Sequence, residues 1–329
     1  MTQLTRRHLL AGAGAAVVAP FAAPMPAQAA APLAGKQAPG FYRYMVGSHE
    51  VTVVTDGARS FPLTASYVTN AKLEDVGKAL EAIHMPKDRM TQHYAPIVVN
   101  TGSKLVVIDT GSGPNAYAQT KGELGQFATN LAAAGIDPKA VDTVIISHFH
   151  NDHVSGLIGA DKKLAFPNAE VMVPATEWKF WMDDGEMSRA SKGRMEGLFR
   201  INRTVFDALN RKVTPYDWNK EIAPGITSVA TVGHSIGHTS FVIASGSSKV
   251  FVQSDVTNHP GVFARNPGWA GAFDQDPAQA VATRAKVYDM LVAEKMLVQG
   301  FHYPFPGLAY VEKTGSGYLE IPAPWNPTI

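Results

Sequence analysis

The hydrophobic pattern of the N-terminal third of the chain predicts strands and one helix. Residues 49–57 (HEVTVVTDG) alternate apolar and polar positions and stop at a glycine, which predicts a first strand. Two β-branched runs separated by a Gly/Ser turn occupy residues 95–113 (APIVVNTGSKLVVIDTGSG), which predicts a β-hairpin closed near Asp109. Apolar residues recur at helical spacing in residues 121–136 (KGELGQFATNLAAAGI), so we expect a helix that ends at Gly135.

The rest of the chain continues this alternation, with a strand-poor region in its middle. Residues 141–147 (VDTVIIS) form a nearly continuous apolar run, which is typical of a strand buried inside a sheet. Bulky side chains at broken helical spacing fill residues 175–222, where we expect a helical insertion beside a site. Further strands are expected at 168–174 (NAEVMVP), 225–234 (GITSVATVGH), 240–255 (SFVIASGSSKVFVQSD, a second hairpin) and 295–302 (KMLVQGFH), with a helix at 277–294.

Hairpins that alternate with helices predict an α/β fold. We expect one domain over residues 49–329, in which two mixed β-sheets face each other and helices lie outside. The chain has 329 residues and 45% hydrophobic content, which allows a large core. Charged residues make up only 17%, the net charge is +1 and both signs are mixed, so we expect no nucleic-acid partner. Because the chain has no cysteine, any metal site must use nitrogen and oxygen ligands.

The first thirty residues are typical of an export signal. They combine a basic start, an apolar middle and a small-residue cleavage motif at residues 27–29 (AQA), and the pair Arg6 and Arg7 resembles the twin-arginine class. We therefore expect a periplasmic or secreted protein. A membrane anchor is disfavoured because prolines interrupt the apolar stretch, so stable membrane insertion is not expected. An N-terminal arm, residues 31–48, follows; it could pack on a partner subunit, which leaves a homodimer open.

A cluster of metal-binding side chains follows the buried run that ends at residue 147. A single buried histidine is more often a hydrogen-bonded core residue, but four such groups at one strand end would cost several kcal/mol to desolvate without a partner. Three more metal-capable groups end later β-rich runs. Together they complete two sets of three ligands and one carboxylate able to bridge, which predicts two metal ions. The seven groups are His148, His150, Asp152, His153, His234, Asp255 and His302.

Two motifs, HFHNDH (148–153) and GHSIGH (233–238), with Asp255 and His302 downstream, resemble the metallo-β-lactamase superfamily. The resemblance implies a four-layer αβ/βα sandwich with the metal site at one edge. Further segments resemble the methyl parathion hydrolase-like branch, an exported group of dinuclear hydrolases. These segments are 39–57 (PGFYRYMVGSHEVTVVTDG), 98–111 (VVNTGSKLVVIDTG), 165–171 (AFPNAEV) and 300–307 (GFHYPFPG).

The resemblance also implies a role for each candidate residue. His148, His150 and His234 would hold one metal, Asp152, His153 and His302 the other, and Asp255 would bridge them. Asp109 matches a position that orients a ligand from behind, although a simple turn residue before Gly111 is an equally good interpretation. His238 competes with His234 as ligand; we prefer His234 and expect a structural role for His238. The family often has glycine where this chain has Ser254.

Two metals that share a water predict hydrolysis, since they lower the pKa of that water from near 16 toward about 7 and supply a bridging hydroxide as nucleophile. Asp255 and Asp152 are the carboxylates expected to act in catalysis. Zinc is the default ion for a histidine-rich site, with manganese, cobalt or iron open.

The substrate class is a separate inference. No Arg/Lys cluster appears near the ligands in the sequence, which favours a small, neutral, apolar ester: a lactone or aryl ester, with organophosphate triesters as a further class. Alternatives are β-lactam hydrolysis and metal binding without turnover. The pocket wall is expected to include Trp178, Phe199, His259 and Phe273.

Overall fold

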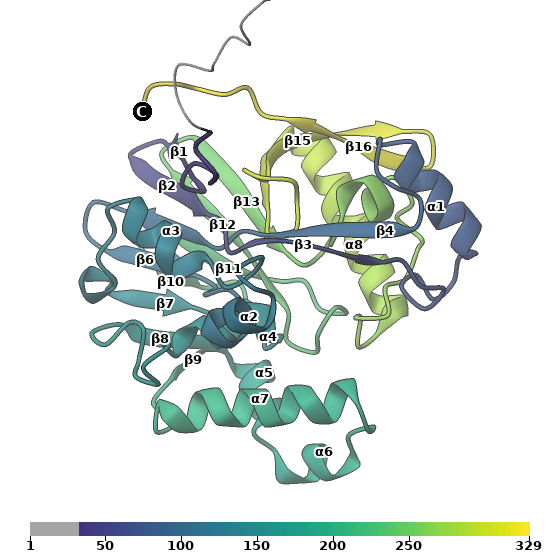
Figure 1. Cartoon of the computed structure of the whole chain (residues 1–329). Helices are drawn as coiled ribbons and strands as arrows, with labels where there is room; N and C mark the ends of the chain where they lie inside the picture. The colour runs from purple at the N-terminus through teal and green to yellow at the C-terminus, as the bar shows by residue number, and fades with distance from the viewer. Residues whose placement is uncertain (1–32) are drawn as a thin grey trace, which may run out of the picture. The chain divides into compact units, whose positions relative to one another are not determined.

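The computed structural model describes residues 33–329, so the expected export signal lies outside the described residues. Residues 33–38 contain no helix or strand, and residues 39–329 form one compact unit. The unit contains two seven-stranded sheets and a small two-stranded sheet (Figure 1). Among the described residues, no helix is both long and apolar enough to cross a bilayer.

The first sheet has the strand order β1-β2-β5-β6-β7-β8-β9. Its pairs are antiparallel from β1 to β6 and parallel from β6 to β9. The hairpin expected at 95–113 is present as β5 and β6. The strands are β1 (Phe41–Val46), β2 (His49–Val54), β5 (Ile97–Asn100), β6 (Leu105–Ile108), β7 (Thr143–Ile145), β8 (Glu170–Pro174) and β9 (Thr214–Tyr216).

The second sheet has the order β10-β11-β12-β13-β14-β15-β16 and is antiparallel except between β13 and β14. Its middle contains the second expected hairpin, β12 and β13. The strands are β10 (Glu221–Ala223), β11 (Ile226–Ala230), β12 (Thr239–Ser245), β13 (Ser248–Ser254), β14 (Leu297–Gly300), β15 (Leu308–Thr314) and β16 (Gly317–Pro322).

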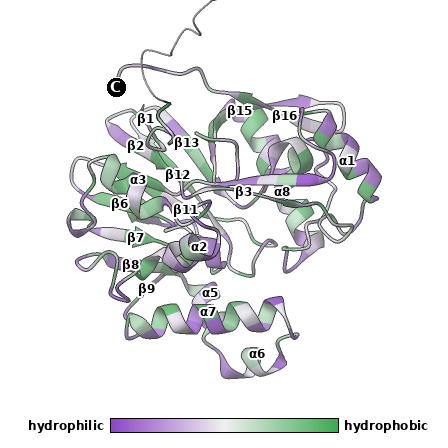
Figure 2. Ribbon diagram, viewed as in Figure 1, coloured by the Kyte–Doolittle hydropathy of each residue, from purple (hydrophilic) through white to green (hydrophobic). Residues whose placement is uncertain are grey.

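The two large sheets share one apolar core. Val51, Val99 and Ile145 of the first sheet are fully buried in one cluster with Phe241 and Ile243 of the second. Figure 2 shows hydrophobic residues concentrated along the strands, whereas α7 alternates between hydrophobic and hydrophilic residues. Apolar side chains from both sheets thus pack against each other between the sheets, as the predicted α/β sandwich requires.

Helices cover the outer faces of both sheets. α3 (Phe127–Ala133) contacts β1 and β2, and α8 (Pro277–Glu294) packs against β15. The α8 bounds match the expected helix at 277–294, where Asp276 caps the N-terminus by accepting from the backbone N–H of Gln279. The remaining helical elements are α1 (Leu73–Glu81), α2 (Gly113–Gln119), η2 (Pro138–Ala140), α4 (Asn151–Val154), η3 (Ser155–Leu157), α5 (Ala175–Trp181), α6 (Asp184–Arg189), α7 (Arg194–Ala208) and η4 (Pro260–Ala264).

The structure corrects three expected boundaries. The arm 31–48 contains β1, which pairs with β2 along its full length. The region 175–222 is helical only as far as Ala208, because β9 and the start of β10 lie within it. β9 has three residues and contains a proline, which an edge strand tolerates but a sequence pattern does not reveal. The helix expected at 121–136 begins only at Phe127, because Gly122 and Gly125 adopt φ values of 89° and 75°.

Two antiparallel strand pairs were not predicted. One is the small sheet of β3 (Gly57–Pro62) and β4 (Arg89–Tyr94), which are separated in the chain by α1. The other is β15 and β16 at the C-terminal end. β4 separates two cavities, because adjacent residues of a strand point to opposite sides. Gln92 lines one cavity and His93 lines the other.

Candidate metal centre

Four strand ends bring the candidate ligands to one place. The HFHNDH segment follows β7: His148 and His150 lie on the extended approach to α4, and Asp152 and His153 lie in its single turn. Asp255 comes directly after β13, and His302 lies two residues after β14. The chain reaches His234 beyond the end of β11, in the loop to β12. Asp255 and His302 lie at the same edge of the second sheet because β13 and β14 run parallel.

The first cluster consists of three imidazoles. His148, His150 and His234 each direct one ring nitrogen to a common point, and these atoms lie within 4.8 Å of one another. Nδ1 of His150 is 3.0 Å from Nε2 of His148 and 2.8 Å from Nε2 of His234. Burial lowers the pKa of His148 and of His150 well below the usual value, so their lone pairs are available. Three ring nitrogens that face each other fit a cation at their centre.

The second cluster consists of Asp152, His153, Asp255 and His302, whose ligand atoms also lie within 4.8 Å of one another. Nε2 of His302 is 2.9 Å from Oδ2 of Asp255 and 3.4 Å from Oδ2 of Asp152. Nε2 of His153 and Oδ1 of Asp255 face each other at 3.3 Å, yet both atoms are buried without a hydrogen bond to any described residue. Buried polar atoms need a partner, so this donor set fits a bound metal ion.

Asp255 belongs to both clusters. Its Oδ2 lies 3.2 Å from Nε2 of His234 in the first cluster, besides its contact with His302 in the second. The side chain is 4% exposed, and the neighbouring histidines hold its pKa well below the usual range against the opposing effect of burial. An ionised carboxylate between two sets of imidazoles is positioned to serve two metal ions at once.

Asp109 lies behind His153. Its Oδ2 accepts a hydrogen bond from Nδ1 of His153 at 2.8 Å, and its two oxygens accept from the backbone N–H and the hydroxyl of Ser147, each at 2.8 Å. The bond to Nδ1 leaves Nε2 of His153 facing the cluster without a proton. Asp109 has a φ of 62°, so it is also the turn residue that the sequence suggested. The structure combines the two interpretations that the sequence left open.

Ser254 and His238 support the bridging aspartate. Ser254 has a φ of 52°, in the left-handed region that favours glycine, which explains why the family often has glycine there. Its hydroxyl donates to Oδ2 of Asp109 at 3.3 Å. Nε2 of His238 accepts from the backbone N–H of Asp255 at 3.0 Å, while its Nδ1 donates to the carbonyl of Thr231 at 3.0 Å. Both nitrogens of His238 are therefore used, and burial lowers its pKa to about 3.

Two carboxylates that hold the ligand-bearing segments in place were not predicted from the sequence. Asp274 accepts from Nδ1 of His234 at 2.9 Å, as Asp109 does for His153. Glu177, at the start of α5, is fully buried and accepts hydrogen bonds from both ligand-bearing loops. No metal-ligand spacing marks either residue. Glu177 accepts from Phe149 N at 2.9 Å, Trp181 Nε1 at 2.8 Å, Ser235 Oγ at 2.7 Å and Gly237 N at 2.5 Å.

A cavity of about 340 Å³ opens over the two clusters. Of the four expected wall residues, Phe273 lines this cavity. The structure corrects the expectation for the other three. Phe199 is fully buried in the core against Trp181, and Trp178 packs on Phe206. His259 lines a separate cavity.

The cavity wall contains residues that the sequence did not single out. Tyr67 packs edge-on against Phe273, with ring centroids 5.7 Å apart. Arg59 and Arg194 also line the cavity, and a guanidinium nitrogen of Arg194 lies 3.4 Å from Nε2 of His150. No Arg/Lys cluster appears near the ligands in the sequence, but the fold brings Arg59 and Arg194 to the cavity from distant positions, Arg194 as the first residue of α7.

The facing mixed sheets and the two ligand clusters at one edge define a metal-binding α/β sandwich. The chain belongs to the metallo-beta-lactamase superfamily, whose family model matches residues 92–287.

Curated relatives and solved structures extend this likeness. The chain is 27% identical over 169 residues to an N-acyl homoserine lactonase of Bacillus thuringiensis, and the match spans 51% of this chain and 58% of that relative. A lactonase of the same name from Bacillus cereus is 28% identical over 177 residues, spanning 54% of this chain and 61% of the relative. The chain therefore matches less than two thirds of the length of these relatives.

Two solved structures superpose on most of the chain. The structure of AidC, described as a dizinc quorum-quenching lactonase in complex with a product, is 24% identical, with a TM-score of 0.80 over 87% of this chain and 98% of AidC. The structure of AbOPH, described as a hydrolase in the beta lactamase superfamily, is 26% identical, with a TM-score of 0.80 over 88% of this chain and 100% of AbOPH. The fold predicted from the sequence is confirmed; the branch within the superfamily stays a prediction.

Proposed function

We propose that this protein is a two-metal hydrolase of lactones, with N-acyl homoserine lactones as the first substrate class to test. The observation that carries the proposal is the contact of Asp255 with both clusters, 3.2 Å from His234 and 2.9 Å from His302, at the floor of a cavity of about 340 Å³. The names of the curated relatives support the lactone class.

The chain's own residues would hold and orient the metals. His148, His150 and His234 form one set, Asp152, His153 and His302 the other, and Asp255 belongs to both; their nitrogen and oxygen donors suit zinc. Two bound divalent ions would polarise a substrate carbonyl and lower the pKa of water near them. Asp109 and Asp274 fix the ring orientations of His153 and His234, so that these rings would hold metal ions without reorganisation.

The cavity wall suits a neutral ester with polar carbonyl groups and an apolar portion. Phe273 and Tyr67 offer an aromatic surface, and Arg194 offers N–H donors beside His150. A lactone oxygen can accept from Arg194 while the acyl part packs on the aromatic rings. Aryl esters share these features and belong to the same proposal. Phosphotriesters and β-lactams stay alternatives, because no residue contact in the cavity distinguishes them.

A hydrolysis panel tests the proposed function. The full chain, reconstituted with zinc, is offered N-hexanoyl-homoserine lactone, an aryl ester, a phosphotriester and a β-lactam. We expect the highest kcat/KM for the lactone. Cleavage of the lactam but not the lactone would favour the β-lactamase alternative, and metal binding with no cleavage of any substrate would favour the non-catalytic alternative.

Export to the periplasm or beyond the cell is a second part of the proposal, carried by Arg6 and Arg7 in the sequence. Replacement of both arginines by lysine is expected to retain the protein in the cytoplasm, as measured by cell fractionation of the expressing bacterium. An unchanged distribution between fractions would contradict export through these arginines.

The homodimer is tested by light scattering of the purified protein, where the mass of a monomer would exclude a dimer.

A further inference from the structure

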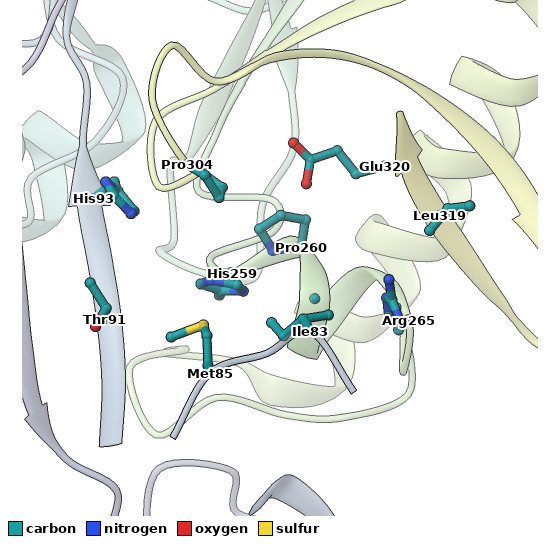
Figure 3. A pocket seen from close by; sticks show the side chains of 11 residues that line it. Ile83, Met85, Thr91, His93, His259, Pro260, Arg265, Pro304, Leu319 and Glu320 are labelled. Atoms are coloured by element: carbon teal, nitrogen blue, oxygen red, sulfur yellow. The ribbon is translucent and has the colours of Figure 1, made fainter. Parts of the chain in front are cut away.

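Figure 3 shows a second cavity, of about 360 Å³. It lies on the far side of β4 from the metal centre. Adjacent residues on two segments divide between the cavities: Gln92 and Asn258 line the metal-site cavity, whereas His93 and His259 line the second. Glu320 enters from β16, and Figure 3 shows its side chain extending toward Pro304, with Pro260 drawn between its carboxylate and the ring of His259. The proposed hydrolysis uses none of the side chains that line this cavity.

The polar groups in the second cavity lack partners. His259 is 3% exposed, and its Nδ1 is buried without a hydrogen bond to any described residue. Within residues 33–329, the carboxylate of Glu320 makes no hydrogen bond and no ion pair within 4.0 Å. Burial raises the pKa of Glu320 to about 7, although the nearby guanidinium of Arg265 opposes that rise. The buried Nδ1 of His259 is costly without a partner, whereas the half-buried carboxylate of Glu320 is accessible to a ligand.

The spacing of these groups excludes one bare metal ion. Throughout residues 33–329, only the two clusters of the metal centre bring three or more ligand atoms of this kind within 4.8 Å of one another. His93, His259 and Glu320 therefore lie too far apart to coordinate a single ion as they stand. A ligand that reaches them must be larger than an ion.

The inward-facing polar groups of the cavity are hydrogen-bond acceptors, which favours a cation. Burial lowers the pKa of His259 to about 4, so its imidazole is neutral and can accept a hydrogen bond at neutral pH. The only positively charged group in the lining is Arg265, an exposed residue, whereas the carboxylate of Glu320 reaches inward. Ile83, Met85 and Leu319 supply apolar surface between these groups.

We propose that this cavity binds a small organic ammonium ion. Its N–H groups donate to the carboxylate of Glu320 and to the imidazole of His259, while its apolar part packs against Met85 and Leu319. The site adjoins the metal centre, because the backbone carbonyl of His93 accepts from Nδ1 of His302 at 2.7 Å. The proposal does not depend on the identity of the hydrolysed substrate.

Titration calorimetry with cyclohexylammonium as probe tests this site on the zinc-loaded full chain at about pH 8. Cyclohexanol and cyclohexanecarboxylate have a similar shape without the positive charge. We expect one binding site, and at least about tenfold tighter binding of the ammonium than of either analogue, because a charge-assisted hydrogen bond is lost in both. Binding of the ammonium is expected to weaken as the pH falls below about 7, where Glu320 takes up a proton.

Three variants locate the binding. Glu320→Gln keeps the shape of the side chain and is expected to weaken cyclohexylammonium binding at least about tenfold. His259→Phe fills the same space without a lone pair and is expected to weaken it by a smaller factor. Glu312→Gln, an exposed position on the paired strand β15, is the matched control and should change nothing. Zinc content and melting temperature identify any variant that fails to fold.

The proposal is overturned if Glu320→Gln binds the ammonium as tightly as the unaltered chain. It is equally overturned if cyclohexanecarboxylate binds more tightly than cyclohexylammonium, or if folded, zinc-loaded protein binds neither.

Discussion

Oδ2 of Asp255 lies 2.9 Å from Nε2 of His302. Nδ1 of His302 donates to the carbonyl of His93 at 2.7 Å, so Nε2 turns a lone pair toward a carboxylate oxygen. Two acceptors at this distance require a cation or a proton between them. Because Oδ2 also lies 3.2 Å from Nε2 of His234, one oxygen of Asp255 connects the two ligand clusters.

Asp255→Asn is expected to remove the connection between the clusters. The amide offers one oxygen instead of two and carries no charge, so we expect zinc content to fall from about two ions to about one. Lactone kcat/KM should fall by about 100-fold or more. Asp161→Asn, in an exposed loop, is the control. Retention of both zinc ions and of full turnover in Asp255→Asn would contradict the shared role.

Asp109→Asn is expected to weaken zinc binding by about 10- to 100-fold, because Nδ1 of His153 loses the charged acceptor that orients the ring. Zinc affinity is measured by competition with a chelator, which reports on metal holding independently of turnover. Asp142→Asn, on the surface after η2, provides a comparison at a carboxylate far from the ligands. Equal zinc affinity in the two variants would show that Asp109 does not orient His153 for metal binding.

Glu177→Gln is expected to lower the free energy of unfolding by about 2–4 kcal/mol. The carboxylate accepts four hydrogen bonds, whereas the amide nitrogen of glutamine would face donors such as Gly237 N or Trp181 Nε1. Urea unfolding measures the change, with the exposed Glu123→Gln as control. A loss below about 0.5 kcal/mol would show that the two ligand loops do not depend on Glu177.

Arg194→Met is expected to raise KM for the lactone by about tenfold and to leave kcat within a few-fold. The guanidinium lies at the wall of the cavity, 3.4 Å from the outer nitrogen of His150, and not among the ligand atoms. Lys192→Met, nearby and exposed, is the control. A large fall in kcat with unchanged KM would place Arg194 in the chemical step instead.

Glu320 is expected to make the free energy of unfolding depend on pH. Burial raises its pKa to about 7, above the value near 4.3 of an unfolded glutamate, so the folded state binds the extra proton. The contribution of Glu320 to the free energy of unfolding is fully present below about pH 4, where the side chain is protonated in both states. It is lost as the pH rises through about 7. Glu320→Gln should therefore gain of order 1 kcal/mol over the unaltered chain at pH 8 and nothing at pH 4, by calorimetric melting. An equal effect at both pH values would contradict this.

The sequence predicted the fold and the ligand candidates where local signals were strong. Gly/Ser turns between β-branched runs located the hairpins β5–β6 and β12–β13, and the helix expected at 277–294 coincides with α8. The spacing of HFHNDH gathered four candidate ligands, because those residues are neighbours in the chain. In the structure all seven candidates meet in two clusters.

Residues that depend on long-range packing could not be predicted. Glu177 and Asp274 act through loops more than 25 residues away, and no spacing rule connects them to His150 or His234. Arg194 reaches the cavity only because α7 folds back over the site. Phe199 and Trp178 were misplaced for the same reason: aromatic residues at helical spacing look alike whether they face the core or a cavity.

Titration of the metal-free full chain with zinc, with hydrolysis of N-hexanoyl-homoserine lactone followed at each step, tests the central claim most directly. If Asp255 joins two metal ions in one hydrolytic centre, turnover should rise to a plateau at about two equivalents of zinc. A plateau at one equivalent, or the absence of lactone hydrolysis at any zinc level, would contradict a shared two-metal lactonase centre.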